Sequence, residues 1–177
     1  GDWRMTSILK VTEIQDPTNS NSALSIDSSG RILFPQLPCA CVSLTTANSQ
    51  DGSNPYTTTG ADILFDVVTI NQGSVYNASN GRFTAPIAGI YEFSYNYLKD
   101  DANTVTYLNV FKNGSQYTGA GGRAYSENPN TYAMTSMTLL ISLAANDFLT
   151  LQLGSGGIHI DGSAYAFYHS IVFKLVG

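Results

Sequence analysis

The chain has 177 residues, of which 43% are hydrophobic, 11% aromatic and 12% charged, with a formal net charge of −5. This length predicts about one domain with room for a short extension. The high aromatic content and low charge exclude a wholly disordered chain, and no apolar run approaches the ~18 residues that a membrane-spanning helix needs. Because the chain is acidic, it lacks the basic surface that nucleic acids require. We therefore expect neither membrane insertion nor a nucleic-acid partner.

The first 38 residues carry little apolar sequence. Two short apolar patterns, at residues 8–11 and 24–26, are separated by a polar stretch, and a predicted turn at 27–31 leads into residues 32–34. Isolated hairpins of this size are marginal in water, so the segment must pack on the main domain, on a partner or on copies of itself.

Two prolines, Pro35 and Pro38, predict a linker after this segment. We expect an N-terminal β-rich anchoring or docking segment at residues 1–38 and a globular domain at residues 39–177. No secretory signal is recognisable at the start of the sequence, because residues 1–5 show no basic region followed by an apolar stretch. Whether residues 1–4 are native, or whether an upstream part is missing, is left open.

Beyond residue 38 the apolar residues alternate with polar or small ones, which is typical of half-buried strands. The alternating stretches are residues 42–44, 63–67, 91–97 and 107–111. Asn113-Gly114 supplies the positive φ angles of a type I′ turn and predicts that residues 110–112 fold back onto 115–117. We also expect Tyr132–Leu143 to form a strand pair with residues 148–153 around the Asn146-Asp147 turn. The pattern specifies an all-β antiparallel sandwich or barrel.

Catalytic motifs are missing from the sequence. It contains neither a Gly-x-Ser-x-Gly elbow, nor a phosphate-binding Gly-rich loop, nor a His-Glu-x-x-His pair. The histidines are His159 and His169, and Asp161 could orient the His159 ring, but we interpret both histidines as structural. We therefore expect no catalytic residues and no enzymatic activity.

Metal and cofactor sites are also not expected. Cys39 and Cys41 could act with the two histidines as zinc ligands, but a Cys-x-Cys spacing is not that of common zinc sites. We interpret the cysteines as small buried side chains that share one face of a strand, too strained to bridge, and leave their role open. The calcium candidates are Asp100-Asp101 and the acids of loop 51–62, which we interpret as solvated loop residues.

The most informative pattern is a ladder of aromatic residues with interleaved asparagine and glycine. It consists of Phe65, Asn71, Tyr76, Phe83, Gly89, Tyr91, Phe93 and Tyr95. Residues two apart on a strand point to one face, so the last three aromatics should project together into a core. Gly89 should permit a bend where their strand begins.

These eight residues resemble, at every spacing, the aromatic signature of the complement C1q globular-head family. Lys112-Asn113-Gly114 is similar to the family's central hairpin, and residues 145–151 are similar to its Gly-Asp strand entry, with Asn146 in place of the usual Gly. The resemblance covers about residues 38–177. It implies a ten-strand jelly roll of the C1q and tumour necrosis factor type that assembles as a homotrimer and binds through its outer surface and loops, without catalytic residues.

A second resemblance concerns the N-terminal part. Residues 5–17 and 23–32 are similar in texture to the opening segments of bacteriophage fibre proteins, and neither a collagen-like stalk nor a signal peptide is seen. We therefore expect a non-enzymatic virion protein, a trimeric phage fibre or a capsid or tail decoration protein. Residues 1–38 would dock it on other virion proteins, and the head would face outward to contact a host-surface glycan or receptor. Loops 120–132 and 154–162 suit such recognition, while the ligand itself is left open.

Two alternatives are retained. The first is a secreted, extracellular C1q-like adhesin or lectin of a cellular organism. The second is a glycan hydrolase, which is disfavoured because the carboxylates fall mostly on turns and strand ends, not as a pair in a cleft.

Overall fold

The computed structural model describes residues 11–15, 22–34, 36–45, 55–100, 105–127, 129–130, 132–160 and 168–177. The chain divides into two compact units, Gly1–Leu37 and Pro38–Gly177. The described residues include no helix that is long and apolar enough to cross a membrane.

The N-terminal unit is a small antiparallel sheet in the order β1-β2-β3. Its strands are β1 (Glu13–Gln15), β2 (Ser22–Ile26) and β3 (Ile32–Leu33). The predicted turn between β2 and β3 is confirmed, because one Asp27 carboxylate oxygen accepts hydrogen bonds from the backbone of Ser29 and Arg31, each at 2.9 Å. Gly30 has a φ of 78°, which the turn requires. Short strands joined in this way bury little surface of their own.

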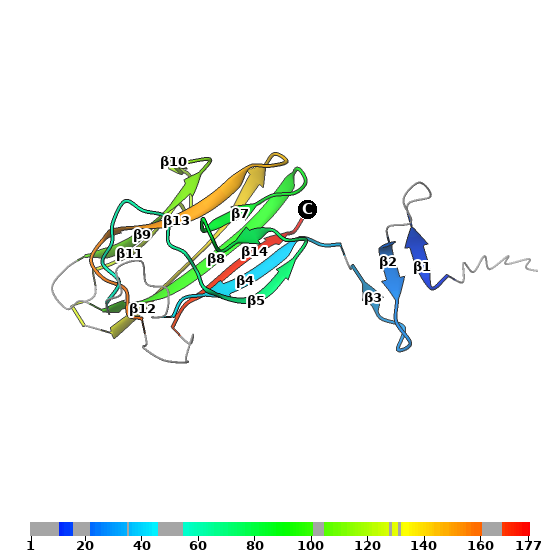
Figure 1. Ribbon diagram of the computed structural model, residues 1–177, viewed down its shortest axis with the longest axis horizontal. Coiled ribbons are helices and arrows are strands. Elements are labelled where there is room, and N and C mark those ends of the chain that lie inside the picture. Colours follow the sequence, from blue (N-terminus) through cyan, green and yellow to red (C-terminus); the bar gives the residue numbers. More distant parts are fainter. Residues whose placement is uncertain are drawn as a thin grey trace, which may run out of the picture. The chain divides into compact units, whose positions relative to one another are not determined.

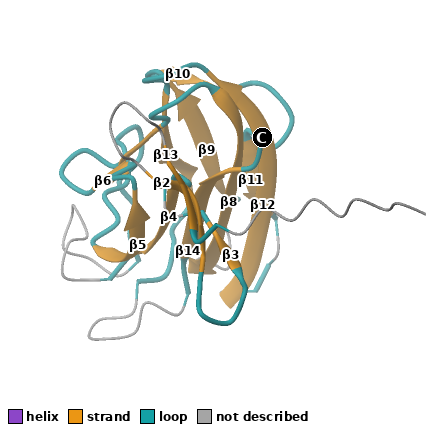
Figure 2. Ribbon diagram, turned by 90° about the vertical axis from the view of Figure 1, so that its right-hand side faces the viewer, coloured by secondary structure: helices purple, strands orange, loops and turns teal. Residues whose placement is uncertain are grey.

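The second unit is a sandwich of two antiparallel sheets. One sheet has the order β10-β9-β13-β7-β6 with β11 also paired to β9, and the other has the order β12-β8-β14-β4-β5. In Figure 1, β14 (red) lies between β8 and β4, and Figure 2 shows only strands and loops. The strands are β4 (Cys39–Ser43), β5 (Val67–Gln72), β6 (Tyr76–Asn77), β7 (Arg82–Thr84), β8 (Gly89–Asp100), β9 (Thr106–Lys112), β10 (Ser115–Gln116), β11 (Arg123–Ser126), β12 (Tyr132–Leu143), β13 (Phe148–Ser155) and β14 (Ser170–Leu175).

The predicted all-β antiparallel sandwich is confirmed. The described part of this unit has one strand more than the ten expected, and two of its strands, β6 and β10, are only two residues long. The Asn113-Gly114 hairpin is also confirmed, with φ angles of 51° and 79° and with Ser115 opposite Lys112.

The predicted pairing of β12 with β13 is wrong, although both strands exist. β12 pairs along its whole length with β8, whereas β13 pairs with β9 and β7 in the other sheet. At the turn between them, Asn146 has a φ of 70°, and the chain passes from one sheet to the other. The two strands therefore bury their apolar faces against the shared core from opposite sides.

The core is centred on the ring of Phe83. Its centroid lies 4.6 Å from that of Tyr76, 5.2 Å from that of Phe93 and 6.0 Å from that of Phe173. The rings come from both sheets, and all four side chains are almost fully buried. Tilted and edge-on contacts at these distances are favourable for aromatic pairs.

Two polar side chains of the ladder each form a pair of hydrogen bonds with the backbone of another ladder residue. The Tyr76 hydroxyl donates to the carbonyl of Phe65 at 2.9 Å and accepts from its N–H at 2.8 Å. The Asn71 amide donates to the carbonyl of Tyr76 and accepts from its N–H, each at 2.9 Å. The spacing of these three residues therefore has a physical cause, since the Asn71 side chain pairs with the backbone of Tyr76 and the Tyr76 side chain pairs with the backbone of Phe65.

Gly89 lies where the chain enters β8, directly after a bend at residues 86–88. A Cβ there would lie 2.6 Å from a Leu175 methyl carbon and 2.8 Å from the Gly177 carbonyl oxygen. The missing side chain therefore also allows the close approach of the end of β14 and the residues after it.

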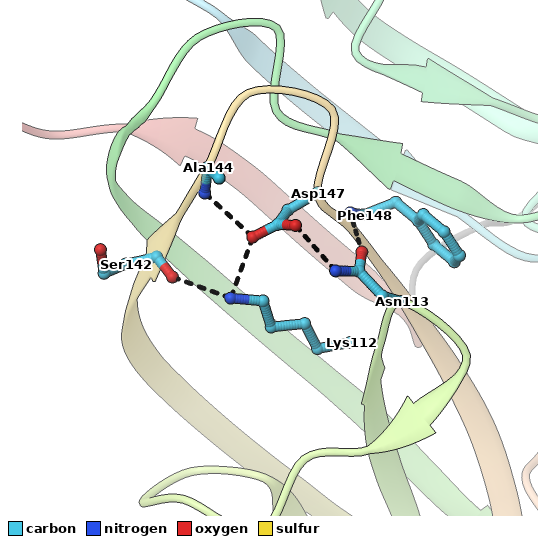
Figure 3. A network of polar contacts seen from close by, with 6 residues as sticks. All are labelled: Lys112, Asn113, Ser142, Ala144, Asp147 and Phe148. Carbon is cyan, nitrogen blue, oxygen red and sulfur yellow. Dashed lines mark hydrogen bonds and ion pairs between the residues drawn. The ribbon is translucent and has the colours of Figure 1, made fainter.

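A polar network joins two turns at one end of the sandwich (Figure 3). Asp147 accepts hydrogen bonds from the backbone N–H of Ala144 at 2.9 Å and from the Asn113 amide at 2.7 Å, and it lies 3.0 Å from the Lys112 ammonium. The Asn113 amide oxygen accepts from the N–H of Phe148 at 2.9 Å. The Asn113 hydrogen bond, the Ala144 N–H and Lys112 together lower the pKa of Asp147 to about 2.

We expect Tyr76→Phe to lower the free energy of unfolding by about 1–3 kcal/mol, because it leaves a buried N–H and C=O of Phe65 without their partner. The measurement is urea unfolding at one fixed protein concentration. Tyr132→Phe, at a side chain that is 63% exposed, is the matched control and should change stability by less than about 0.5 kcal/mol. Equal effects of the two substitutions would contradict this account of Tyr76.

We expect the stability of the Asp147→Asn variant to change less than that of the wild type between pH 4 and pH 2. The pKa of Asp147 is about 2 in the folded protein against an ordinary value of 3.8, so its stabilisation is complete above pH 4 and is lost as the pH falls towards 2. The wild-type protein should therefore have the higher melting temperature at pH 6, and the difference should shrink towards pH 2. Glu127→Gln removes the same charge from an exposed position and should give no such pH-dependent difference.

Candidate assembly surface

The five-stranded sheet has one face in the core and one face turned away from it. Along β12 the buried residues alternate with exposed ones, and the register places the exposed residues in rows across the sheet. One row runs Thr138, Ser94, Val172, Cys41 and Ile70, and the next runs Leu140, Glu92, Lys174, Cys39 and Gln72.

This outer face is apolar and nearly uncharged. Leu140 is 64% exposed, and Met134, Ile90, Ile70 and Val176 are about half exposed. In the row with Leu140, the Glu92 carboxylate lies 3.1 Å from the Lys174 ammonium, so the two charges offset each other. The Ser94 and Thr138 hydroxyls are hydrogen-bonded at 3.0 Å. An exposed apolar area with its polar groups already paired is typical of a protein interaction surface.

The two edges of this face differ, which limits how copies of it can meet. Leu140 and Met134 belong to the edge strand β12, whereas Ile70 belongs to the opposite edge strand β5. A contact between one edge of the first copy and the other edge of the second is heterologous. Such contacts close into a ring when each step is a suitable rotation.

Sequence reasoning missed this face. Its signal is visible in the run Leu139-Leu140-Ile141, where a half-buried strand should show a polar residue in the middle. The strand was expected from the Thr, Ile and Ser content of Tyr132–Leu143 and from the turn after it, and neither feature indicates which face is exposed.

Cys39 and Cys41 are half-buried on this outer face, so the expectation that they are buried core residues is wrong. They do share a face, as expected. Ala40 and Val42 occupy the positions that point into the core, and alternation along β4 turns the cysteines outward. Burial raises the pKa of the Cys39 thiol. Their role stays open.

The two histidines lie at the end of β8. His159 Nδ1 lies 2.8 Å from the Asp100 carboxylate, and its ring meets those of Tyr132 and Tyr168 edge-on. Burial lowers the pKa of His169 to about 4, so this ring is neutral at pH 7 and bonds the carbonyl of His159. Asp161, the partner considered from the sequence, lies outside the described residues.

Among the described residues, no group of three or more His, Cys, Asp or Glu side chains could hold a metal ion. Of the calcium candidates, Asp100 is paired with His159, and Asp62 accepts hydrogen bonds from Thr150 and Gln152. Asp51 and Asp101 lie outside the described part, as do portions of loops 120–132 and 154–162.

The aromatic ladder lies in the core and not on a surface. Phe65, Tyr76, Phe83, Tyr91, Phe93 and Tyr95 are all buried. These residues therefore contact other core side chains and backbone, and they are not accessible to a partner. The accessible apolar side chains of this unit include those on the outer face of the five-stranded sheet.

Two facing antiparallel sheets of this order define a jelly roll of the C1q and tumour necrosis factor class. The globular domain of zebrafish complement 1qA is similar over 80% of this chain and 98% of that one, with a TM-score of 0.57 and 14% identity. The tumour necrosis factor Eiger of S. frugiperda is similar over 80% of this chain and 94% of that one, with a TM-score of 0.60 and 11% identity. At these identities the likeness shows the fold alone.

A family model for the C1q domain matches residues 46–172, and the chain therefore belongs to the C1q domain family. Human complement C1q tumor necrosis factor-related protein 3 is 26% identical over 104 residues, which are 59% of this chain and 41% of that protein. Mouse complement C1q tumor necrosis factor-related protein 2 is 30% identical over 118 residues, 66% of this chain and 38% of that protein. Zebrafish Caprin-2 is 25% identical over 94% of this chain and 17% of its own length.

Proposed function

We propose that the chain is a non-enzymatic binding protein that acts outside the cell as a homotrimer. Its C1q-domain heads assemble through the outer face of the five-stranded sheet, and its N-terminal unit docks the trimer on a larger structure. The observation that carries the proposal is this face, which exposes apolar side chains, has Glu92 paired with Lys174 and has different residues at its two edges. Membership of the C1q domain family supports self-association.

The extracellular setting rests on the relatives. They are animal proteins, two of them named for complement C1q and tumor necrosis factor, and this favours a cellular organism's secreted protein over a virion component. The chain spans about two fifths of the length of these two relatives, so their activities as whole proteins are not carried over.

A virion fibre or decoration protein is the second candidate, and one observation favours it. The N-terminal unit lies outside the residues that match the C1q model, and it exposes Ile26, Ile32 and Leu33. These side chains need a partner, and a virion base would supply one. Co-sedimentation of the full chain with virions, lost when residues 1–37 are removed, would favour this candidate.

We expect Leu140→Glu to convert the trimer to monomers at micromolar concentration, because three buried, unpaired carboxylates would be costly. Light scattering measures the mass, and circular dichroism checks that the sandwich remains folded. The control is Gln116→Glu, an exposed position on the other sheet, which should stay trimeric. A Leu140→Glu protein that is still trimeric would place the interface elsewhere.

We expect a protein of residues 38–177 to remain a trimer, since this unit has its own core and carries the proposed interface. The measurement is solution mass beside that of the full chain. A trimeric full chain with a monomeric shorter form would show that the N-terminal unit holds the assembly together. A monomer in both cases would overturn the trimer.

A further inference from the structure

The outer face of the six-stranded sheet carries a cluster of aromatic and polar side chains where β9 pairs with β11. Tyr107 lies opposite Tyr125 in the register, and their rings are stacked with centroids 6.0 Å apart and planes 23° apart. Arg123 lies two residues before Tyr125, on the same face of β11. Its guanidinium carbon is 4.4 Å from the centroid of the Tyr107 ring.

Arg123 is held by two independent contacts. Its Nε donates to the Asn109 amide oxygen at 2.7 Å, and the flat face of its guanidinium covers Tyr107. The Tyr107 ring is itself fixed against the backbone, because a Cβ at Gly154 would lie 2.0 Å from a ring carbon. Both contacts leave the two Nη groups of Arg123 unused. The arginine is therefore preorganised, with less side-chain entropy to lose on binding than a mobile surface arginine has.

The groups around this arginine are accessible and polar. Arg123, Gln116 and Glu127 are exposed, and Tyr125 is 47% exposed. Gln116 lies beside Arg123, because its side-chain nitrogen is 3.5 Å from the same Asn109 oxygen. The Tyr125 hydroxyl donates to the Glu127 carboxylate at 2.6 Å, which fixes the ring. The cluster thus combines an amphipathic aromatic surface, a planar cationic fork, an amide and a carboxylate within one small patch.

We propose that Arg123, Tyr125 and Gln116 form a binding site for an acidic saccharide of the uronic-acid class. The sugar carboxylate accepts two parallel hydrogen bonds from the Nη groups of Arg123. The apolar face of the pyranose ring packs on Tyr125, and ring hydroxyls exchange hydrogen bonds with the Gln116 amide and the Glu127 carboxylate. The inference rests on the proposed function and specifies the ligand class of its binding head.

The choice of ligand follows from charge and shape. The planar guanidinium of Arg123 matches the geometry of a carboxylate, whereas a neutral sugar would offer it no charged partner. A purely apolar ligand would desolvate the guanidinium, the amide and the carboxylate without compensation. Three such sites on a trimer would combine weak contacts with a polysaccharide through effective concentration.

The same sheet supplies a matched control. The guanidinium of Arg82 lies 4.0 Å above the ring of Phe148, so it is stacked in the same way, but that ring has no hydroxyl. If stacking only stabilises the sheet, Arg123→Lys and Arg82→Lys should behave alike. If Arg123 binds a carboxylate, the two substitutions should differ in ligand affinity alone.

The experiment is calorimetric titration of the full-length protein with trigalacturonate, with its methyl ester and with maltotriose. We expect binding of trigalacturonate only. Arg123→Lys, which keeps the charge but loses the planar fork, and Tyr125→Ala should each weaken it about tenfold or more. Arg82→Lys should stay within about twofold of wild type, and all variants should keep the wild-type mass and circular dichroism.

Several outcomes would overturn the site. The first is that the methyl ester binds as tightly as trigalacturonate, and the second is that Arg123→Lys and Arg82→Lys lose the same affinity. The third is that acetate binds as tightly as trigalacturonate, which would mean that the site recognises a carboxylate and not a sugar. A trimer that binds no trigalacturonate overturns the saccharide site and leaves the proposed assembly intact, whereas a monomer overturns the assembly independently.

Discussion

The sandwich depends on tyrosines whose rings lie in the core and whose hydroxyls bond backbone at its margins. Tyr76 bonds both backbone groups of Phe65, Tyr91 bonds the carbonyl of Ile87, and Tyr97 bonds that of Thr106 in the opposite sheet. Each ring supplies apolar contact, and the hydroxyls of Tyr76 and Tyr97 bond carbonyls inside the sandwich. Burial raises the pKa of Tyr97 to about 12, so the hydroxyl stays protonated and able to donate.

The two outer faces of the sandwich can serve different functions. Because the core is complete between the sheets, neither outer face is needed to stabilise the single unit. The five-stranded sheet presents apolar side chains with offset charges, which fits contact with further copies. The six-stranded sheet presents Arg123 and Tyr125, which fits a polar ligand, and binding there would leave the assembly face unoccupied.

Local patterns were sufficient to predict the strands and the fold class. The Asn113-Gly114 turn is encoded by two adjacent residues, and the strand β12 by its Thr, Ile and Ser content and the turn that follows it. The partner of β12 could not be predicted, because Asn146-Asp147 is an equally good signal for a hairpin and for a crossing between sheets. The outward position of Cys39 and Cys41 was missed for a related reason, since alternation states which residues share a face but not which face is buried. The Arg123 cluster needs the register of three strands, which no single stretch of sequence contains.

The pairing of β4 with β14 joins the first and last strands of the domain, with Cys41 opposite Val172. β14 also pairs with β8, so it is the central strand of the five-stranded sheet. This sheet therefore cannot be completed until β14 has been synthesised. Folding of such non-local pairings is slow, because loop closure precedes the contacts that reward it. During synthesis, the edge of β8 that later pairs with β14 therefore stays unpaired until β14 emerges. An unpaired strand edge with apolar residues beside it favours aggregation in this period.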